Sequence, residues 1–225
     1  MGAAHDFAPL PGFQLRGPNH YPHRAMAARV HLVRHGEVHN PDHLVYASLP
    51  GFTLSSTGEA QARAVARYLG RQPVVGVWSS PLERALRSAE PLAQRVGLPV
   101  RIEADLTEWQ LMGRWAGITW EDIPKKFPGE LEAFLEDPSR LDFAPESLAD
   151  LAQRVAGAVQ RLHESHPHGD VVAFSHSAPI RAAILRLTGG SLRDYWVDEP
   201  GHCAVTTLRP GAPWTIETVW APETE

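Results

Sequence analysis

The chain has 225 residues, of which 43% are hydrophobic and 21% charged, a composition typical of a globular protein that buries a full core in one or two domains. Its formal net charge of −5 argues against a protein that coats nucleic acid or binds membranes through basic residues, because both need an excess of positive charge. The single cysteine, Cys203, excludes an internal disulfide and any metal site built from several thiolates.

Residues 1–28 are predicted to form a flexible extension before the folded domain. They contain Pro9, Pro11, Pro18 and Pro22 and lack the apolar stretch of roughly 7–15 residues that an export signal needs. No apolar run in the chain approaches the roughly 18 residues of a membrane span. We therefore expect a cytoplasmic protein without a membrane contact, which agrees with a lone, reduced cysteine.

A first strand and helix are predicted directly after this extension. The run RVHLVR at residues 29–34 is typical of a short strand. Residues 56–69 are expected to form a helix, because Ser56 and Glu59 make a capping box and apolar residues recur at helical spacing. One strand-helix unit thus opens the domain.

A second strand and helix follow. The β-branched run VVGVW at residues 74–78 predicts a buried strand, and residues 81–96 predict a helix with a proline near its start. Pro91 is expected to kink or split this helix, because proline lacks the backbone N–H and clashes with the preceding turn. Residues 100–102 are a candidate third strand.

The next 44 residues carry no long periodic pattern. Residues 103–146 are irregular, rich in Trp, Phe and Pro, and compatible with two short helices. Their aromatic side chains either form the core of this segment or wall a binding pocket, and the sequence leaves both alternatives open. The aromatic residues are Trp109, Trp115, Trp120, Phe127, Phe134 and Phe143. An amphipathic helix over residues 148–163 follows.

The last third of the chain returns to alternating elements. Residues 170–174 (DVVAF) predict a buried strand, and residues 179–187 predict a helix that ends at Gly189-Gly190. Residues 202–208 and 214–220 predict two further strands. These two strands either pair as a hairpin or lie apart in the sheet.

This alternation predicts an α/β fold, a three-layer α/β/α sandwich around a mostly parallel central sheet. Ligands of such sheets bind beyond the carboxyl ends of the strands. Three predicted strands are followed there by polar clusters, and we expect these clusters to bring two histidines and two arginines into one cleft. The clusters are Arg34-His35-Gly36-Glu37, Ser79-Ser80-Pro81-Leu82-Glu83-Arg84 and Ser175-His176-Ser177.

Such a cleft suits the transfer of a phosphoryl group. Paired guanidiniums favour an anion with several oxygens, and their charge keeps a neighbouring imidazole neutral and nucleophilic. A second imidazole can donate a hydrogen bond to the charge that develops on the transferred group. The leaving oxygen needs a proton from a carboxylic acid, for which Glu108 is the favoured candidate and Glu37 and Asp105 are weaker ones.

Five motifs in fixed order then identify a family. They are Arg34-His35-Gly36-Glu37; Leu54-Ser55 with Gly58 and Gln61-Ala62; Ser79-Ser80-Pro81-Leu82-Glu83-Arg84-Ala85; Leu106-Thr107-Glu108 with Gly113 and Trp115-Ala116-Gly117; and Ser175-His176. Together they resemble the histidine phosphatase superfamily, which has the phosphoglycerate-mutase-like fold. The resemblance runs from about residue 29 to residue 208. An isolated Arg-His-Gly would be a weak signal, whereas five ordered motifs are specific.

The resemblance implies a role for each matched residue. His35 would be the nucleophile that becomes phosphohistidine, and Arg34, Arg84 and His176 would bind the phosphoryl oxygens and stabilise the transition state. Glu108 would protonate the leaving alcohol and then activate water.

Two further positions are candidate substrate contacts. Asn40 matches a position that often contacts phosphate in the family. Ser177 stands where glycine is frequent, so the backbone after the second histidine is expected to differ slightly. Val38 stands where many members have threonine, a change that alters the polarity of the pocket.

We therefore predict one domain over residues 29–225, with a cap-like insertion at about residues 106–146 that selects the leaving group. The domain is expected to hydrolyse a small phosphorylated metabolite without a metal or other cofactor and without a nucleic-acid partner. A homodimer is compatible with the sequence. The insertion favours a singly phosphorylated substrate because it holds few cations, namely Arg114, Lys125, Lys126 and Arg140.

Two other functions stay open at this point. One is a phosphoglycerate mutase, which shares the chemistry but retains the phosphate. The other is a catalytically silent module that binds phosphorylated ligands. Phosphate release, isomerisation of 3-phosphoglycerate and turnover of p-nitrophenyl phosphate distinguish the three.

Overall fold

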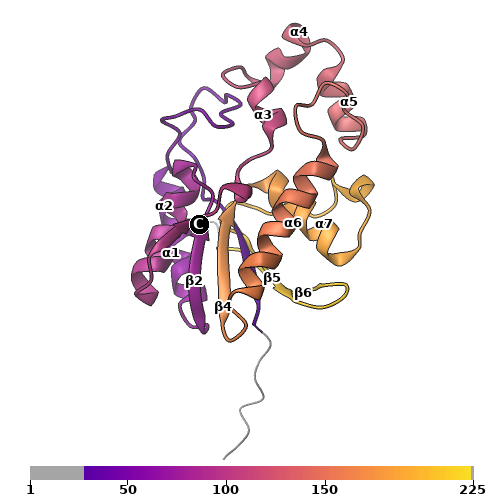
Figure 1. Cartoon of the computed structure of the whole chain (residues 1–225). Coiled ribbons are helices and arrows are strands. Elements are labelled where there is room, and N and C mark those ends of the chain that lie inside the picture. Colours follow the sequence, from indigo (N-terminus) through magenta and orange to yellow (C-terminus); the bar gives the residue numbers. More distant parts are fainter. Residues whose placement is uncertain (1–27, 224–225) are drawn as a thin grey trace, which may run out of the picture.

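The computed structural model describes residues 28–223, so the extension predicted over residues 1–28 lies, apart from residue 28, outside the described residues. Six strands form one sheet in the order β3-β2-β4-β1-β5-β6 (Figure 1). The strands are β1 (Val30–Arg34), β2 (Val74–Ser79), β3 (Val100–Ile102), β4 (Asp170–Ser175), β5 (Val205–Arg209) and β6 (Thr215–Trp220). Strands β1 to β4 are mutually parallel, whereas β5 runs antiparallel to β1. Strand β6 pairs antiparallel with β5, so the hairpin alternative is the correct one.

Helices cover both faces of the sheet (Figure 1). The helices are α1 (Ser56–Leu69), α2 (Glu83–Val96), α3 (Gln110–Arg114), α4 (Ile123–Lys126), α5 (Glu130–Glu136), α6 (Leu148–Glu164) and α7 (Ser177–Thr188), with 3₁₀ turns η1 (Ala104–Leu106), η2 (Trp120–Asp122) and η3 (Leu192–Asp194). One hydrophobic cluster joins α1 and α2 to the sheet, and a second cluster joins α6 and α7 to it. The predicted three-layer sandwich is confirmed.

The central strands are apolar because both of their faces are covered. In β1, Leu32 packs into the cluster of α6 and α7, and the next residue, Val33, packs into the cluster of α1 and α2. Successive side chains of a strand point to opposite faces, so a strand between two helical layers needs a continuous apolar run. All six residues of β4 are buried for the same reason.

Three local predictions need correction. Helix α1 is capped by Ser55 rather than Ser56, because the Ser55 hydroxyl accepts a hydrogen bond from the Gly58 amide at 3.0 Å. Helix α2 begins at Glu83 and continues through Pro91 as one helix, so the expected split is wrong. Cys203 is buried but precedes β5, with a backbone φ of 56°, rather than lying inside a strand.

The segment between β3 and α6 has more structure than predicted. It holds three short α-helices and two 3₁₀ turns, where the sequence indicated two short helices. Figure 1 shows α3, α4 and α5 beyond one end of the sheet, on the side opposite to the start of β1. Trp109, Trp115 and Phe134 are buried and join the cluster of α6 and α7. Across residues 28–223, no helix combines the length and apolar character needed to cross a membrane.

Candidate active site

The ends of three neighbouring strands build the centre of the site. Arg34, the last residue of β1, pairs with Ser175 at the end of β4. The amide of His35 donates to the Ser175 carbonyl at 3.0 Å, and the amide of Ser80 donates to the Phe174 carbonyl at 2.9 Å. The sheet order β2-β4-β1 therefore brings the three predicted polar clusters together at one edge.

His35 is held in the neutral form, and its hydrogen-bond partner indicates which ring nitrogen carries the hydrogen. Its side chain is buried, and Nδ1 lies 2.8 Å from the Gly36 carbonyl oxygen. A carbonyl only accepts, so Nδ1 carries the hydrogen and the lone pair lies on Nε2. Burial, followed by the positive charge of Arg84, holds the pKa of His35 well below its usual value. A neutral imidazole with a lone pair on Nε2 is a nucleophile at neutral pH.

The loop that carries His35 is packed tightly between α1 and α2. The Gly36 amide donates to the Ser88 hydroxyl oxygen at 2.9 Å, and that hydroxyl donates to the Arg84 carbonyl at 2.7 Å. A Cβ on Gly36 would lie 2.6 Å from the Gly58 carbonyl oxygen, so a larger residue would push the loop away from α1. Glycine at positions 36 and 58 therefore allows the close contact between this loop and α1 that positions His35.

Two further cationic or hydrogen-bonding groups face His35. The ring of His176 lies 5.2 Å from the ring of His35, and its Nε2 lies 2.8 Å from the Ser80 hydroxyl. Burial, followed by the charge of Arg84, holds the pKa of His176 well below its usual value. The Arg84 side chain is 2% exposed and packs over the Tyr46 ring at 4.8 Å.

Several buried donors of this cluster are unsatisfied. Nδ1 of His176, Nε and Nη2 of Arg84, and Nε of Arg34 have no hydrogen-bond partner within the described part of the chain. An unsatisfied buried donor costs roughly 1–3 kcal/mol. Such donors near one imidazole form a site for an anion with several oxygens.

Arg34 links this cluster to the loop before β5. Its Nη1 donates to the Pro200 carbonyl at 2.7 Å and to Glu199 Oε1 at 3.3 Å, and its Nη2 lies 3.4 Å from Nε2 of His202. The His202 ring is 5.7 Å from that of His35. Burial, followed by the charge of Arg34, lowers the pKa of His202 to about 4. Sequence reasoning missed His202 and Glu199, because no motif marks them and residue 202 stood only as the start of a predicted strand that in fact begins at Val205.

Glu108 is the carboxylate that lies near His176 and Arg84. Its Oε2 lies 3.9 Å from Nη2 of Arg84 and 3.9 Å from Nδ1 of His176. Burial raises the pKa of Glu108, and the charge of Arg84 only partly opposes this shift. The weaker candidates lie elsewhere: Glu37 accepts from the Ser55 hydroxyl at 2.6 Å, and Asp105 pairs with an arginine of α6.

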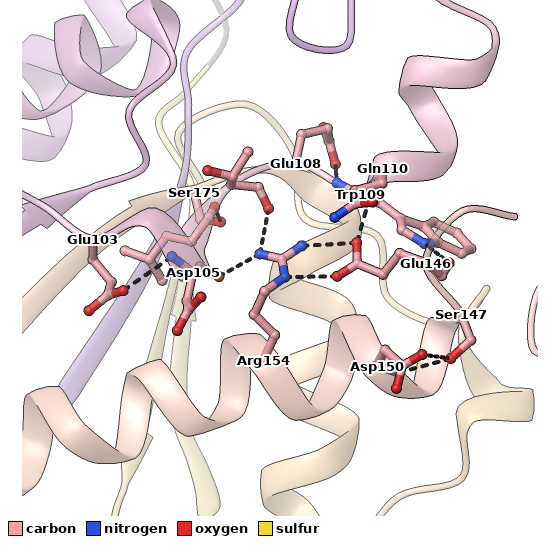
Figure 2. A network of polar contacts seen from close by, with 12 residues as sticks. Glu103, Asp105, Glu108, Trp109, Gln110, Glu146, Ser147, Asp150, Arg154 and Ser175 are labelled. Carbon is pink, nitrogen blue, oxygen red and sulfur yellow. Dashed lines mark hydrogen bonds and ion pairs between the residues drawn. The ribbon is translucent and has the colours of Figure 1, made fainter.

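A partly buried ion pair anchors the segment that carries Glu108 (Figure 2). Arg154 of α6 donates to both carboxylate oxygens of Glu146, from Nε at 2.8 Å and from Nη2 at 3.0 Å. Its Nη1 donates to the carbonyls of Asp105 at 2.7 Å and Thr107 at 3.1 Å. Sequence reasoning missed this pair, because an arginine on an amphipathic helix is typical of a solvated face.

Glu146 also holds the backbone that follows Glu108. Glu146 accepts from the Gln110 amide at 3.2 Å, and its carbonyl accepts from Nε1 of Trp109 at 2.8 Å. The Trp109 amide donates to Glu108 Oε1 at 2.9 Å. The backbone on both sides of Glu108 is therefore tied to Arg154 and Glu146, which we call the Arg154–Glu146 pair.

The two predicted substrate contacts occupy different surroundings. The Asn40 amide closes a turn with the backbone of Leu44, donating at 2.9 Å and accepting at 3.1 Å. Asn40 lines a side pocket together with Glu37 and His202. The Ser177 hydroxyl donates to Glu199 Oε1 at 3.1 Å and lines the same cavity as Arg34 and Glu108.

This cavity has a volume of about 350 Å³ and leads from Arg34 and Glu108 toward the segment between β3 and α6. Its far wall is apolar and mostly aromatic. The residues of this wall are Met112, Trp120, Phe134, Leu135, Tyr195 and Trp196, whereas Tyr46 lines the cavity near His35 and Arg84. Over residues 28–223, no group of three or more His, Cys, Asp or Glu side chains is arranged to hold a metal ion.

Known proteins share this sequence pattern. The sequence profile of the histidine phosphatase superfamily (branch 1) matches residues 30–218. An uncharacterised protein of Mycobacterium tuberculosis is 40% identical over 80% of this chain and 87% of its own. Glucosyl-3-phosphoglycerate phosphatase of the same organism is 32% identical over 86% and 94%. Phosphoserine phosphatase 1 of Hydrogenobacter thermophilus is 32% identical over 73% and 78%.

A solved structure shares the fold. The native structure of a mycobacterial glucosyl-3-phosphoglycerate phosphatase superposes with a TM-score of 0.76 at 29% sequence identity. The match covers 88% of this chain and 100% of the other. The similarity therefore includes the sheet, both helical layers and the edge where the polar clusters meet.

Proposed function

The chain belongs to the histidine phosphatase superfamily and is a phosphatase, and we propose that it hydrolyses monoesters of small metabolites through a phosphohistidine on His35. One observation carries the proposal. A buried neutral imidazole lies beside the unsatisfied donors of Arg84 and His176 and beside a carboxyl group whose pKa is raised. This combination supplies a nucleophile, an oxyanion site and a general acid within one pocket.

In the first half of the proposed reaction, Nε2 of His35 attacks the phosphorus atom. The N–P bond forms as the P–O bond to the alcohol breaks, and protonated Glu108 gives its proton to the departing oxygen. Arg34, Arg84 and His176 bind the non-bridging oxygens. The Ser80 hydroxyl supports this role, because donation to Nε2 of His176 leaves the hydrogen on Nδ1, the nitrogen nearest Glu108.

In the second half, water replaces the alcohol. The Glu108 carboxylate takes a proton from the water, the oxygen attacks phosphorus, and the N–P bond breaks to return neutral His35 and inorganic phosphate. The proton that Glu108 gave to the alcohol is thus recovered from water, so the cycle balances without a cofactor. Two similar relatives with a named activity are phosphatases, which favours hydrolysis over the mutase alternative.

The remaining predictions are part of the same proposal. Residues 106–146 act as a cap that selects the leaving group, because Met112, Trp120 and Phe134 line the cavity beyond Glu108. Ser177 contacts the substrate from the first turn of α7, and Asn40 contributes from the loop after β1. We propose that the enzyme works in the cytoplasm, where a lone cysteine stays reduced.

Trapping of the intermediate tests the proposed function. We expect turnover of p-nitrophenyl phosphate in the presence of a chelator, and inhibition by vanadate. When the reaction with labelled substrate is quenched rapidly, we expect a phosphoprotein that is labile in acid and stable in alkali. His35→Ala should form no phosphoprotein, whereas the exposed His39→Ala should label normally. Labelling of His35→Ala at the wild-type level would overturn the assignment, and isomerisation of 3-phosphoglycerate without phosphate release would reveal a mutase.

A further inference from the structure

The part of the cavity that faces the leaving group carries exposed apolar side chains. Trp120 is 41% exposed, Trp196 is 39% exposed and Leu135 is 58% exposed, and all three line the cavity that contains Arg34 and Glu108. Large apolar side chains gathered around an open cavity mark a binding surface more often than they mark an ordinary solvated face. We call these three residues the apolar wall.

Buried packing holds the apolar wall in place. The Phe134 ring lies behind it, 5.0 Å from Trp196 and 6.3 Å from Trp120. Trp120 also contacts the buried Trp115 ring at 6.0 Å. The wall therefore combines two segments that are distant in the sequence, the helices after β3 and the loop after η3. Phe134 lies between these two segments and joins them into one preformed surface.

Three cationic side chains of the cap form ion pairs with acidic residues. Arg114 forms an ion pair with Glu130 at 2.6 Å and Lys125 forms one with Asp122 at 2.6 Å. Arg140 lies 3.6 Å from Asp137. None of these three, nor Lys126, is among the described residues that line the cavity.

One further arginine lines the cavity but is covered. The guanidinium of Arg181 lies over the rings of Tyr195 at 4.1 Å and Trp196 at 5.0 Å, and its Nη2 donates to the Tyr195 carbonyl. The carboxylate of Glu199 lies 3.9 Å from its Nη1 and is itself 54% exposed. A second anionic group on the substrate would approach the exposed Glu199 carboxylate, whereas the guanidinium of Arg181 is 5% exposed and lies behind the two rings.

We propose that the cavity takes an uncharged, apolar leaving group of about the size of an aromatic ring, packed against Trp120, Leu135 and Trp196. This inference rests on the proposed function, because it assigns the substrate class of that site. It also separates this enzyme from its named relatives. Phosphoserine and glucosyl-3-phosphoglycerate each carry a carboxylate, for which this cavity offers the carboxylate of Glu199 and an engaged arginine.

Three phosphate esters of primary alcohols test the proposal: ethyl phosphate, 2-phenylethyl phosphate and the phosphate ester of 3-hydroxypropanoate. They differ only in the group beyond the first two carbons of the alcohol, so the intrinsic reactivity of the phosphate ester stays similar. We expect kcat/KM for the phenylethyl ester to exceed that for the ethyl ester by about tenfold, the order of one aromatic contact. The carboxylate ester should be the poorest of the three.

Variants of the apolar wall show which side chains produce the preference for the phenylethyl ester. Trp196→Ala and Trp120→Ala should each remove most of the advantage of the phenylethyl ester over the ethyl ester. Leu135→Arg should raise the relative rate of the carboxylate ester, because it places a cation on the exposed wall. Trp220→Ala is the matched control, since Trp220 stacks on Tyr68 at 4.3 Å, in the cluster of α1 and α2.

The outcomes separate the two proposals. If all three esters are hydrolysed equally, or the carboxylate ester is preferred, the substrate class is wrong while the phosphatase function stands. The same conclusion follows if the tryptophan variants slow all three esters alike, because the wall would then support the fold only. If no ester is hydrolysed and no phosphoprotein forms, the proposed function itself fails.

Discussion

The two ends of the cavity are built in different ways. At the phosphoryl end, His35, Arg84 and His176 are each at most 2% exposed and lie at or beside strand ends that are fixed by the sheet. At the leaving-group end, Trp120, Leu135 and Trp196 are 39–58% exposed and lie on short helices and a loop. The comparison indicates that the sheet positions the buried polar groups, and we propose that the added segments select the substrate.

Burial explains why the two ends tolerate change differently. Charged donors in a buried pocket interact strongly with an anion, because little water screens them. Removing one of them also leaves its neighbours unsatisfied. Truncating a half-exposed tryptophan removes its contacts with the ligand and with neighbouring rings, but it removes no charged donor from the phosphoryl end. We therefore expect changes at the phosphoryl end to affect every substrate and changes at the other end to affect selected substrates.

The largest effect is expected for His35→Ala, which removes the nucleophile. Turnover of any phosphate monoester should fall by on the order of 10⁴-fold or more, as when other enzymes lose their nucleophile. Steady-state assays with p-nitrophenyl phosphate and an alkyl phosphate measure the loss. Circular dichroism and thermal unfolding should match those of His39→Ala, an exposed control in the same loop. Substantial activity in His35→Ala would place the nucleophile elsewhere, with His202 as the first residue to examine.

Arg84→Ala tests whether the phosphoryl end acts on all substrates alike. The variant should lose about 2–4 kcal/mol of transition-state stabilisation, by analogy with the loss of an oxyanion donor. The loss in kcat/KM should be the same for aryl and alkyl esters, and inhibition by vanadate should weaken in parallel. Arg87→Ala, one turn along the exposed face of α2, is the control. A loss confined to one class of leaving group would contradict the role assigned to Arg84.

The contrast also explains which residues the sequence could reveal. His35, Arg84 and His176 follow strands, and parallel topology brings strand ends to one edge, so their meeting could be predicted from element order. The short helices α3, α4 and α5 have four to seven residues, too few to show a helical period. Sequence reasoning therefore predicted which polar clusters meet at the sheet edge and left open whether the aromatic residues line the pocket.

Residues that reach the site through tertiary contacts were not predictable in the same way. Glu146 and Arg154 are eight positions apart, across the start of α6, and their pairing with the backbone of Asp105 and Thr107 depends on the fold. His202 approaches from a loop without a motif. The cap of α1 was misplaced by one residue because Ser55 and Ser56 are adjacent and both favour an N-cap.

Glu108→Gln should separate substrates by their leaving group. Loss of the general acid should lower kcat/KM for an alkyl phosphate by about 10²-fold and for p-nitrophenyl phosphate by much less, because nitrophenolate departs without a proton. Glu103→Gln, in the turn before Glu108, is the control. Equal losses for both esters would show that another group is the acid.

The pH profile sharpens the same test. Burial raises the pKa of Glu108, and the acid acts in its protonated form, so kcat/KM for the alkyl ester should fall as the pH rises through that raised pKa. The nitrophenyl ester should lack this alkaline limb, and so should Glu108→Gln with either ester. His35 should add no acidic limb near neutral pH, because its pKa is lowered and the reactive form is neutral. An alkaline limb that persists in Glu108→Gln would assign it to a different group.

The smallest effect is expected at the Arg154–Glu146 pair, which holds the backbone around Glu108 but does not line the cavity. Arg154→Met alone would leave the Glu146 carboxylate buried and unpaired, at a cost of roughly 3–5 kcal/mol of stability. The double variant Arg154→Met with Glu146→Gln removes both charges and is the better probe of positioning. It should lower kcat for the alkyl ester by about tenfold, leave KM nearly unchanged, and barely affect the nitrophenyl ester, because only the proton transfer loses its geometry. Arg161→Met, on the same helix and 55% exposed, is the control. If the double variant slows both esters equally, the pair supports the whole phosphoryl end rather than the acid, and the division between the two ends of the cavity would need to be redrawn.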